Sequence, residues 1–263
     1  MSKRSDREYL TGVAYADDAG LQARVSLYDH QQPRVDLVAE ALAMLGPVRE
    51  QRVADVGCGN GRYVRSLGES GAVVLACDLS AGMLASLAPR QRAVVADAQH
   101  LPLVDQSVDA VLLMHMLYHV PDPRLAVREA RRALRPGGRL LVSTNSSRHL
   151  VELREVWRQL VDEVGARGDP EDLDLTNDRF RPEEARSVLR EVFDTVTERT
   201  LRSAVVVADP EPLLRHAAST TAARETAGPH PELLDRLRAS VANAIARDGE
   251  FRVTTEPVVF LAS

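Results

Sequence analysis

The middle of the chain alternates short apolar runs with segments in which apolar residues recur at helical spacing. Five apolar runs are predicted as strands, at residues 52–56, 72–78, 93–97, 109–114 and 139–144. Helices are predicted between them, one ending near Glu69 and others at 80–87 and 123–134. Near-continuous apolar strands separated by helices are typical of a parallel sheet covered on both faces. The pattern therefore predicts a doubly wound α/β fold.

The pattern is weaker on both sides of this region. Further helices are predicted at 33–45, 148–167, 182–192, 210–222 and 231–247, and further strands at 195–200, 203–208 and 251–261. We expect an N-terminal helical segment or lid at 1–46 and a ligand-binding core at 47–147. Residues 148–186 and 209–249 are candidates for a substrate cap made of helical insertions. The remaining residues, 187–208 and 250–263, are expected to add C-terminal strands to the core sheet.

Composition and charge narrow the class of protein. The 263 residues carry a formal net charge of −5, whereas binding to nucleic acid or a membrane surface needs a basic face. No run of about 18 apolar residues could span a membrane, and the first residues lack the apolar run of a signal peptide. Two cysteines, Cys58 and Cys77, are too few for a disulfide framework. We expect a cytoplasmic protein whose partner is a small molecule, not nucleic acid or a membrane.

A glycine-rich turn, Asp55-Val-Gly-Cys-Gly-Asn-Gly61, follows the first core strand. Glycines before a helix let a nucleotide or charged small molecule approach the backbone closely, although an ordinary strand-to-helix turn looks similar. The G-x-G-x-x-G spacing of dinucleotide folds is absent because Arg62 or Val64 stands at the last position, and no P-loop motif is present. Asp55 would repel a pyrophosphate but suits a ligand that carries an ammonium group.

Two more aspartates end the next two predicted strands. Asp78 stands where a doubly wound fold uses a carboxylate to bind ribose hydroxyls. Asp97 can accept a hydrogen bond from an adenine amino group. One aspartate at a strand end is commonly a helix cap, but three along one sheet edge indicate a ligand that contains a nucleoside.

Four motifs resemble, in order and spacing, those of class I S-adenosylmethionine-dependent methyltransferases. They lie at 53–61, 76–80, 95–98 and 134–142, so the resemblance covers about residues 50–145. It implies a seven-stranded, mostly parallel Rossmann-like sheet with an antiparallel last strand. It also implies S-adenosyl-L-methionine as cofactor, S-adenosyl-L-homocysteine as product, and no metal. Carried over by position, the cofactor residues are Asp55, Gly57, Cys58, Gly59, Gly61, Asp78, Leu79, Met83, Asp97, Ala98, Met114 and Arg24.

Within that resemblance, Arg24 is expected to pair with the cofactor carboxylate, although an arginine exposed to solvent is an equal alternative. Met114 ends the fourth strand and would contribute its backbone near the methionine end of the cofactor. The segment after it, up to Val120, would lie beside the reactive methyl group.

This segment contains the candidates for catalysis. His115 and His119 are four residues apart and would share one face of a helical turn, with Tyr118 between them. One histidine is a candidate general base, and a packing role without proton chemistry is the alternative. A metal site is not expected, because the pair lacks the glutamate of H-E-x-x-H and a third ligand.

The candidates for binding the acceptor come from two places. Asn145 and His149 follow the fifth strand, where they could instead cap the next helix. Tyr15, Tyr28 and His30 belong to the N-terminal segment and would reach the site if that segment closes over it, whereas solvent-facing positions explain them equally well.

The function that we expect is methyl transfer to oxygen, nitrogen or an electron-rich carbon of a small molecule in bacterial secondary metabolism. A methyltransferase acting on protein or RNA is one alternative. The N-P-P-[YF] signature of amino-group methylation is absent, since Met114-His-Met-Leu stands at its position. A cofactor-binding protein of the same fold without catalysis is another alternative.

Overall fold

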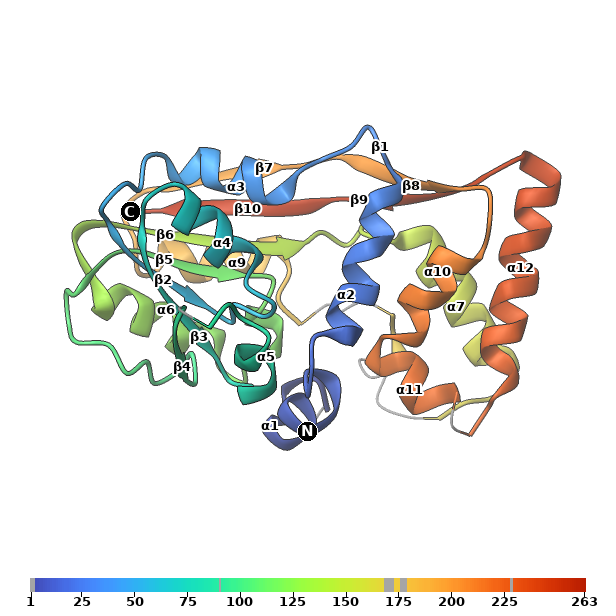
Figure 1. Ribbon diagram of the computed structural model, residues 1–263. Helices are drawn as coiled ribbons and strands as arrows, with labels where there is room; N and C mark the ends of the chain where they lie inside the picture. Colours follow the sequence, from blue (N-terminus) through green and yellow to red (C-terminus); the bar gives the residue numbers. More distant parts are fainter. Residues whose placement is uncertain (1–2, 90, 168–172, 176–178, 228) are drawn as a thin grey trace.

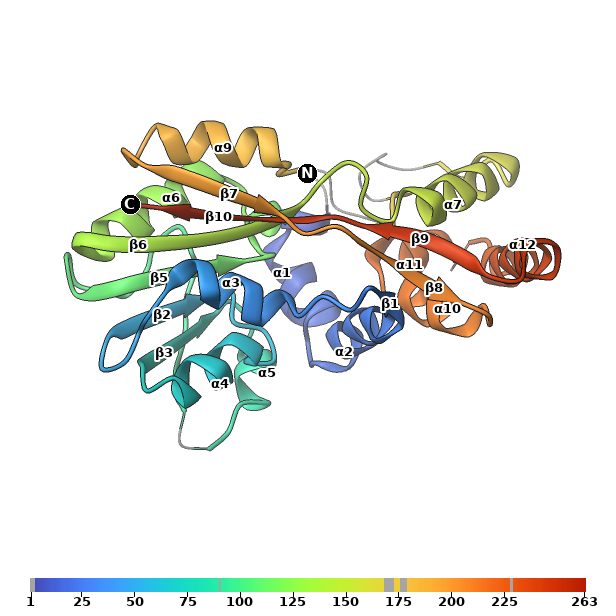
Figure 2. The ribbon, with the colours of Figure 1, turned by 90° about the horizontal axis from the view of Figure 1, so that it is seen from above.

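The computed structural model describes residues 3–89, 91–167, 173–175, 179–227 and 229–263. Figure 1 shows two neighbouring parts: a core built on a large sheet, and a smaller, mainly helical part that we call the cap. Long strands continue from the core into the cap and connect the two (Figure 2).

The core is a seven-stranded sheet with the strand order β4-β3-β2-β5-β6-β10-β7. Its strands are β2 (Arg52–Val56), β3 (Val73–Asp78), β4 (Arg92–Val95), β5 (Val108–Met114), β6 (Leu134–Asn145), β7 (Val196–Thr200) and β10 (Pro257–Ala262). Strands β2 to β6 pair in parallel. The last strand, β10, runs antiparallel to both β6 and β7. This arrangement confirms the predicted fold class.

Helices cover both faces of this sheet, as its apolar strands require. One face carries α3 (Leu37–Leu45), α4 (Arg62–Glu69) and α5 (Ala81–Ala85); the other carries α6 (Pro123–Ala133) and α9 (Pro182–Arg190) (Figure 2). Asp36 and Asp122 each accept two backbone N–H groups at the starts of α3 and α6. These side chains satisfy donors that a helix start leaves without partners.

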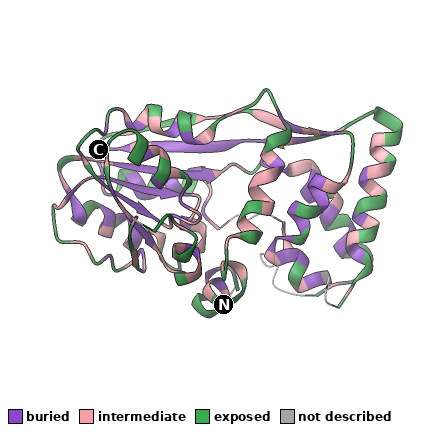
Figure 3. Cartoon of the chain, in the orientation of Figure 1, coloured by how far each residue is buried: buried purple, intermediate pink, exposed green. Residues whose placement is uncertain are grey.

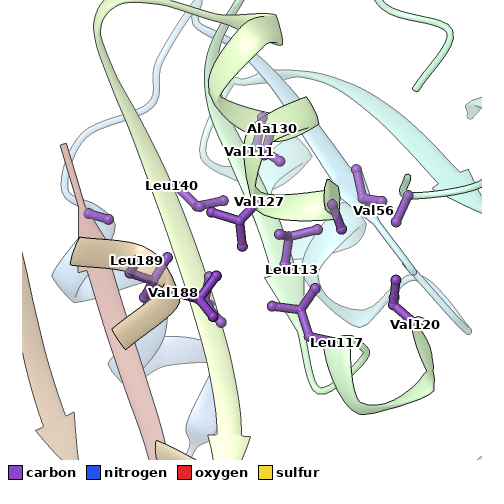
Figure 4. Packing of buried hydrophobic residues seen from close by; sticks show 14 of the residues in the cluster. Val56, Val111, Leu113, Leu117, Val120, Val127, Ala130, Leu140, Val188 and Leu189 are labelled. Atoms are coloured by element: carbon purple, nitrogen blue, oxygen red, sulfur yellow. The ribbon is translucent and has the colours of Figure 1, made fainter. Parts of the chain in front are cut away.

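The apolar layer between the sheet and α6 and α9 fixes the strand ends near the glycine turn (Figure 4). Val111, Leu113 and Leu140 of the sheet are fully buried against Val127 of α6 and Leu189 of α9. Burying each such side chain contributes about 1.5–3 kcal/mol. Most strand residues are buried while the helices expose one side (Figure 3), so the sheet provides a rigid support for whatever binds at its edge.

The cap gathers segments that are far apart in the sequence. It contains α2 (Ala19–Ser26), η3 (Leu27–His30), β1 (Gln31–Gln32), α7 (Val151–Glu163), β8 (Ser203–Val207), α10 (Glu211–Ala218), α11 (Thr221–Ala227), α12 (Glu232–Asp248) and β9 (Phe251–Thr255). Leu27, Trp157 and Leu237 belong to one apolar core of the cap, and each is at most 1% exposed. Both predicted cap segments contribute helices to it, but α9, which begins within 148–186, covers the core sheet instead.

Two predicted strands lie in a different sheet from the one expected. We expected 203–208 and 251–261 to extend the core sheet. The second part of 251–261 does so as β10, but β8 and β9 form a second, antiparallel sheet with β1. The reason is that β7 leads directly into β8, and β9 into β10, with interruptions only at 201–202 and at Glu256. Such short interruptions in an apolar strand pattern do not reveal where the chain leaves one sheet and enters another.

The first described residues lie across the sheet edge next to the glycine turn. They form η1 (Lys3–Ser5), α1 (Arg7–Tyr9) and η2 (Leu10–Ala14), and η1 contacts η4 (Leu117–His119) of the core. The predicted N-terminal segment is therefore divided: residues up to 18 cover the sheet edge, 19–32 belong to the cap, and α3 covers the core sheet. Among the described residues, no helix is both long and apolar enough to cross a membrane.

Candidate functional site

The glycine turn between β2 and α4 is held in a conformation that needs glycine. Gly57, Gly59 and Gly61 have φ angles of 71°, 53° and 75°, a region that side-chain-bearing residues rarely adopt. A Cβ on Gly57 would lie 2.8 Å from the Cβ of Met116. The turn is anchored because the Gly57 and Cys58 N–H groups donate to the Cys77 carbonyl, at 2.8 and 3.0 Å.

Asp55 and Asp78 lie directly beside this turn. Asp55 is only 1% exposed, and its Oδ2 has no hydrogen-bond partner among the described residues. Burial, and secondarily the charge of Asp78, raise the pKa of Asp55 to about 7. Asp78 accepts the N–H groups of Gly59 and Ser80, both at 2.9 Å. Asp55 thus presents an unpaired buried acceptor, the feature that a ligand ammonium group would complete.

A cavity of about 140 Å³ lies under the N-terminal segment, beside Asp78. Leu79, Asp97 and Ala98, which we expect around the adenosine part of the cofactor, line it. The Arg7 guanidinium lies 4.0 Å from Asp97 Oδ2. Three of the predicted cofactor residues, Asp55, Gly61 and Met83, line neither this cavity nor the larger one that adjoins it, and Met83 is only 1% exposed.

A larger cavity of about 310 Å³ continues from the first one into the space between core and cap. Gly57, Tyr15 and His119 line both, so the two adjoin. The core side is formed by the glycine turn and the ends of β5 and β6, where Cys58, Gly59 and Met114 lie as predicted. The cap side is formed by α2, η3 and α10.

Arg24 of α2 faces the larger cavity from the cap side. Its Nη1 donates to the Ser219 carbonyl at 2.7 Å, and its guanidinium lies 5.0 Å from the centre of the Tyr15 ring. Its Nη2 is buried and has no partner among the described residues. Arg24 is therefore not a solvent-exposed arginine, which was the alternative. A ligand carboxylate would complete the hydrogen bonding of its guanidinium group.

The predicted helical turn with both histidines on one face does not form. Only residues 117–119 are helical, and His115 precedes them with a φ of 51°. The His115 N–H donates to Ser143, which fixes this bend, and burial lowers the pKa of the imidazole to about 4. His119 instead bonds the Tyr15 hydroxyl through Nε2 at 2.8 Å. Both histidines and Tyr118 still line the cavity.

Tyr28 and His149 form a buried pair at the cap end of this cavity. The Tyr28 hydroxyl lies 2.9 Å from His149 Nε2, and His149 Nδ1 accepts the Glu256 N–H at 3.1 Å. Burial lowers the pKa of His149 well below its usual value and raises the pKa of Tyr28 to about 12. Both are therefore uncharged near neutral pH.

Several functional candidates were missed or misplaced by the sequence. Tyr63 Oη and His216 Nδ1, like the predicted Asn145 Oδ1, are buried, lack partners among the described residues, and belong to residues that line the cavity. His216 lies among Leu213, Leu214 and Ala217 on the buried side of α10, and one polar residue on an apolar helix face was the available signal. His30, also predicted for the substrate, is exposed and is not among the residues that line the cavity.

The polar groups at the glycine turn and around the two cavities fit the cofactor that the resemblance implies. Asp55 Oδ2 and Arg24 Nη2, which lack partners among the described residues, offer an acceptor for its ammonium group and a donor for its carboxylate. Asp78 lines the smaller cavity and offers a carboxylate for its ribose. Within the described parts of the chain, no three histidine, cysteine or acidic side chains are grouped so that they could hold a metal ion.

Comparison with known proteins points the same way. Residues 54–142 match the family model of a methyltransferase domain. An uncharacterised methyltransferase of Mycobacterium tuberculosis is 37% identical over 145 residues, which are 54% of this chain and 58% of that protein. The chain thus spans less than two thirds of that relative.

Two solved structures share the fold. A candidate methyltransferase from an antibiotic biosynthesis pathway of Anabaena variabilis has a TM-score of 0.62 at 18% identity, over 88% of this chain and 98% of that one. A phosphoethanolamine N-methyltransferase of Haemonchus contortus, solved with phosphomonomethylethanolamine and S-adenosylhomocysteine, has a TM-score of 0.56 at 21% identity. It matches 100% of this chain and 60% of that one.

Proposed function

We propose that this chain is a class I S-adenosylmethionine-dependent methyltransferase and that it methylates a small molecule held between its core and its cap. The acceptor atom is an oxygen, a nitrogen or an electron-rich carbon. The observation that carries the proposal is a pair of buried atoms without partners among the described residues. Asp55 Oδ2 lies at the glycine turn, and Arg24 Nη2 belongs to a residue that lines the cavity between this turn and the cap.

In this proposal the cofactor lies across both cavities. Asp78 binds the ribose hydroxyls, Asp97 and Ala98 meet the adenine edge, and Arg24 pairs with the carboxylate. The N-terminal segment covers the nucleoside, since the Tyr15 carbonyl accepts a hydrogen bond from Ser80 Oγ at 2.6 Å and the Tyr15 hydroxyl contacts His119. When bound, S-adenosyl-L-methionine supplies a methyl group on a positively charged sulfur.

The protein's part in the transfer is to align and to exclude water. A thioether leaving group needs no proton, so the main requirement is an acceptor held in line with the methyl–sulfur bond. The core end of the larger cavity, between the glycine turn and Met114, is where the methyl group would lie. The cap end, with Tyr28, His149 and Asn145, remains for the acceptor.

Protein or RNA substrates are the main alternative. The net charge of −5 works against a polyanionic partner, and residues of the core and the cap line the cavity on both sides. The Anabaena variabilis protein is named for an antibiotic biosynthesis pathway, which is in keeping with a role for this chain in secondary metabolism.

Incorporation of label tests the proposal. The chain is incubated with methyl-labelled S-adenosyl-L-methionine and a bacterial extract, which is then separated into small molecules, protein and RNA. We expect label in the small-molecule fraction, and its loss with Asp78→Ala. Label only in protein or RNA would overturn the small-molecule acceptor. Cofactor binding without label in any fraction would favour a protein of this fold without catalysis.

A further inference from the structure

We propose that the cap end of the larger cavity recognises an uncharged, hydroxylated molecule, with Tyr28 donating a hydrogen bond to it and His216 accepting one from it. The inference rests on the proposed function, and it names the substrate class of the same site. An amine that is protonated at neutral pH is thereby excluded as the acceptor.

The direction of the Tyr28 hydroxyl follows from its neighbours. His149 Nδ1 accepts the Glu256 backbone N–H, so this nitrogen carries no proton. The imidazole is neutral, so its proton lies on Nε2, and Nε2–H donates to the Tyr28 oxygen. The Tyr28 hydrogen is then free to point elsewhere, and the residue lines the cavity. Tyr28 is therefore a donor toward the ligand, and His149 is its positioning residue.

The same chain of hydrogen bonds shows that His149 is not a general base. Its one lone pair is engaged by the Glu256 N–H, and its other nitrogen already holds a proton. A proton from the acceptor therefore has no place on this ring.

His216 presents the opposite polarity. It is 4% exposed, and burial lowers the pKa of its imidazole to about 4, so the ring is neutral. Nδ1 of the ring is buried and has no partner among the described residues. The proposal places the proton of this neutral ring at Nε2. Nδ1 carries a buried lone pair, which needs a donor from the ligand.

The charges around the cavity disfavour a cation. Among the described residues that line it there is no aspartate or glutamate, while Arg24 and Arg62 are present. In the proposed function the cofactor adds a positive sulfur, and its carboxylate is already paired with Arg24. A protonated amine would therefore meet no unpaired carboxylate of the lining residues, and it has no lone pair for the Tyr28 hydrogen. A hydroxyl both donates and accepts, so it can satisfy Tyr28 and His216.

Matched fragments test this inference. Several aromatic rings are each prepared with a hydroxymethyl, an aminomethyl, a carboxylate or a methyl group, and their dissociation constants for the protein saturated with S-adenosyl-L-homocysteine are measured by ligand-observed NMR. We expect hydroxymethyl compounds to bind best, with the methyl and aminomethyl partners roughly tenfold weaker, as for the loss of one or two buried hydrogen bonds.

Variants then assign the preference to residues. Tyr28→Phe and His216→Leu should each lower the ratio between hydroxymethyl and methyl partners, since each removes one of the two proposed hydrogen bonds and nearly keeps the volume. The double variant should bring the ratio to near one. The control Asp29→Asn, on the exposed residue next to Tyr28, should keep the full ratio. Both compounds of a pair are measured on the same variant, so a general loss of structure would weaken both and leave the ratio of their dissociation constants unchanged.

Three outcomes overturn the inference: an aminomethyl or carboxylate series that binds as well as the hydroxymethyl series, no binding by any hydroxymethyl compound, or an unchanged ratio in both variants. Binding of S-adenosyl-L-homocysteine is recorded in the same samples. If that binding is absent, the proposed function itself fails; if it is present while the hydroxyl preference is absent, only the inference about the acceptor fails.

Discussion

Replacing Gly82 with alanine should loosen the N-terminal segment and weaken cofactor binding. Gly82 lies in α5, and a Cβ at this position would lie 1.8 Å from the carbonyl oxygen of Ala16. Without that neighbour, alanine would favour the helix by about 1 kcal/mol. A Cβ and a carbonyl oxygen cannot lie 1.8 Å apart, so we expect the segment before Ala19 to move away.

The cost can be worked out from the contacts that hold the segment. Next to Gly82, Ser80 Oγ donates to the Tyr15 carbonyl at 2.6 Å, and the Tyr15 hydroxyl contacts His119 at 2.8 Å. Losing two such hydrogen bonds costs about 1–3 kcal/mol in total, or roughly a 5- to 150-fold change in affinity if they are needed for cofactor binding.

Calorimetric titration with S-adenosyl-L-homocysteine measures this change. Limited trypsin digestion at Arg7 should show faster cleavage of the variant, with the core and cap intact. The matched control is Gly68→Ala in α4, where a Cβ would meet nothing within 4 Å, so it should bind as the parent does. Equal affinity and equal protection at Arg7 in Gly82→Ala would refute the idea that this segment closes the site.

Three further predictions concern stability. Burial raises the folded-state pKa of Asp55 from 3.8 to about 7, so the free energy of unfolding without cofactor should fall by up to about 4 kcal/mol as pH rises from 4 to 7. Urea midpoints should show this fall in the parent and a flatter pH profile in Asp55→Asn. Equal profiles would contradict the prediction. An alanine at position 57 would have to adopt a φ of 71°, and its Cβ would lie 2.8 Å from the Cβ of Met116. Gly57→Ala should therefore lower the free energy of unfolding by about 1–3 kcal/mol. An unchanged urea midpoint would count against the strained turn. Trp157→Ala should cost about 3–5 kcal/mol in the same assay because Trp157 is 1% exposed in the cap core, and a loss below 1 kcal/mol would mean that the cap core is not packed as described.

The core of the fold could be predicted because its signals are local. The parallel strands are short apolar runs. The glycine turn follows β2, and Ser80, whose Oγ accepts the N–H of Met83, follows β3. The glycine turn, together with the aspartates that end three neighbouring strands, indicated the kind of ligand.

The acceptor end could not be predicted in the same way. Tyr28, His149 and His216 come from η3, the segment after β6, and α10, which only the cap brings together. His30, two residues from Tyr28, looked equally suitable but is exposed. The His115 bend depends on a left-handed residue bonded to Ser143 of the neighbouring strand, and no helical spacing rule reveals such a contact.

The cofactor assignment is the central claim, and a titration of the chain with S-adenosyl-L-homocysteine tests it most directly. We predict saturable binding that Asp78→Ala weakens at least about tenfold, as expected when a carboxylate that accepts hydrogen bonds from the ligand is lost. No binding to the parent chain, or equal binding by parent and Asp78→Ala, would contradict the claim.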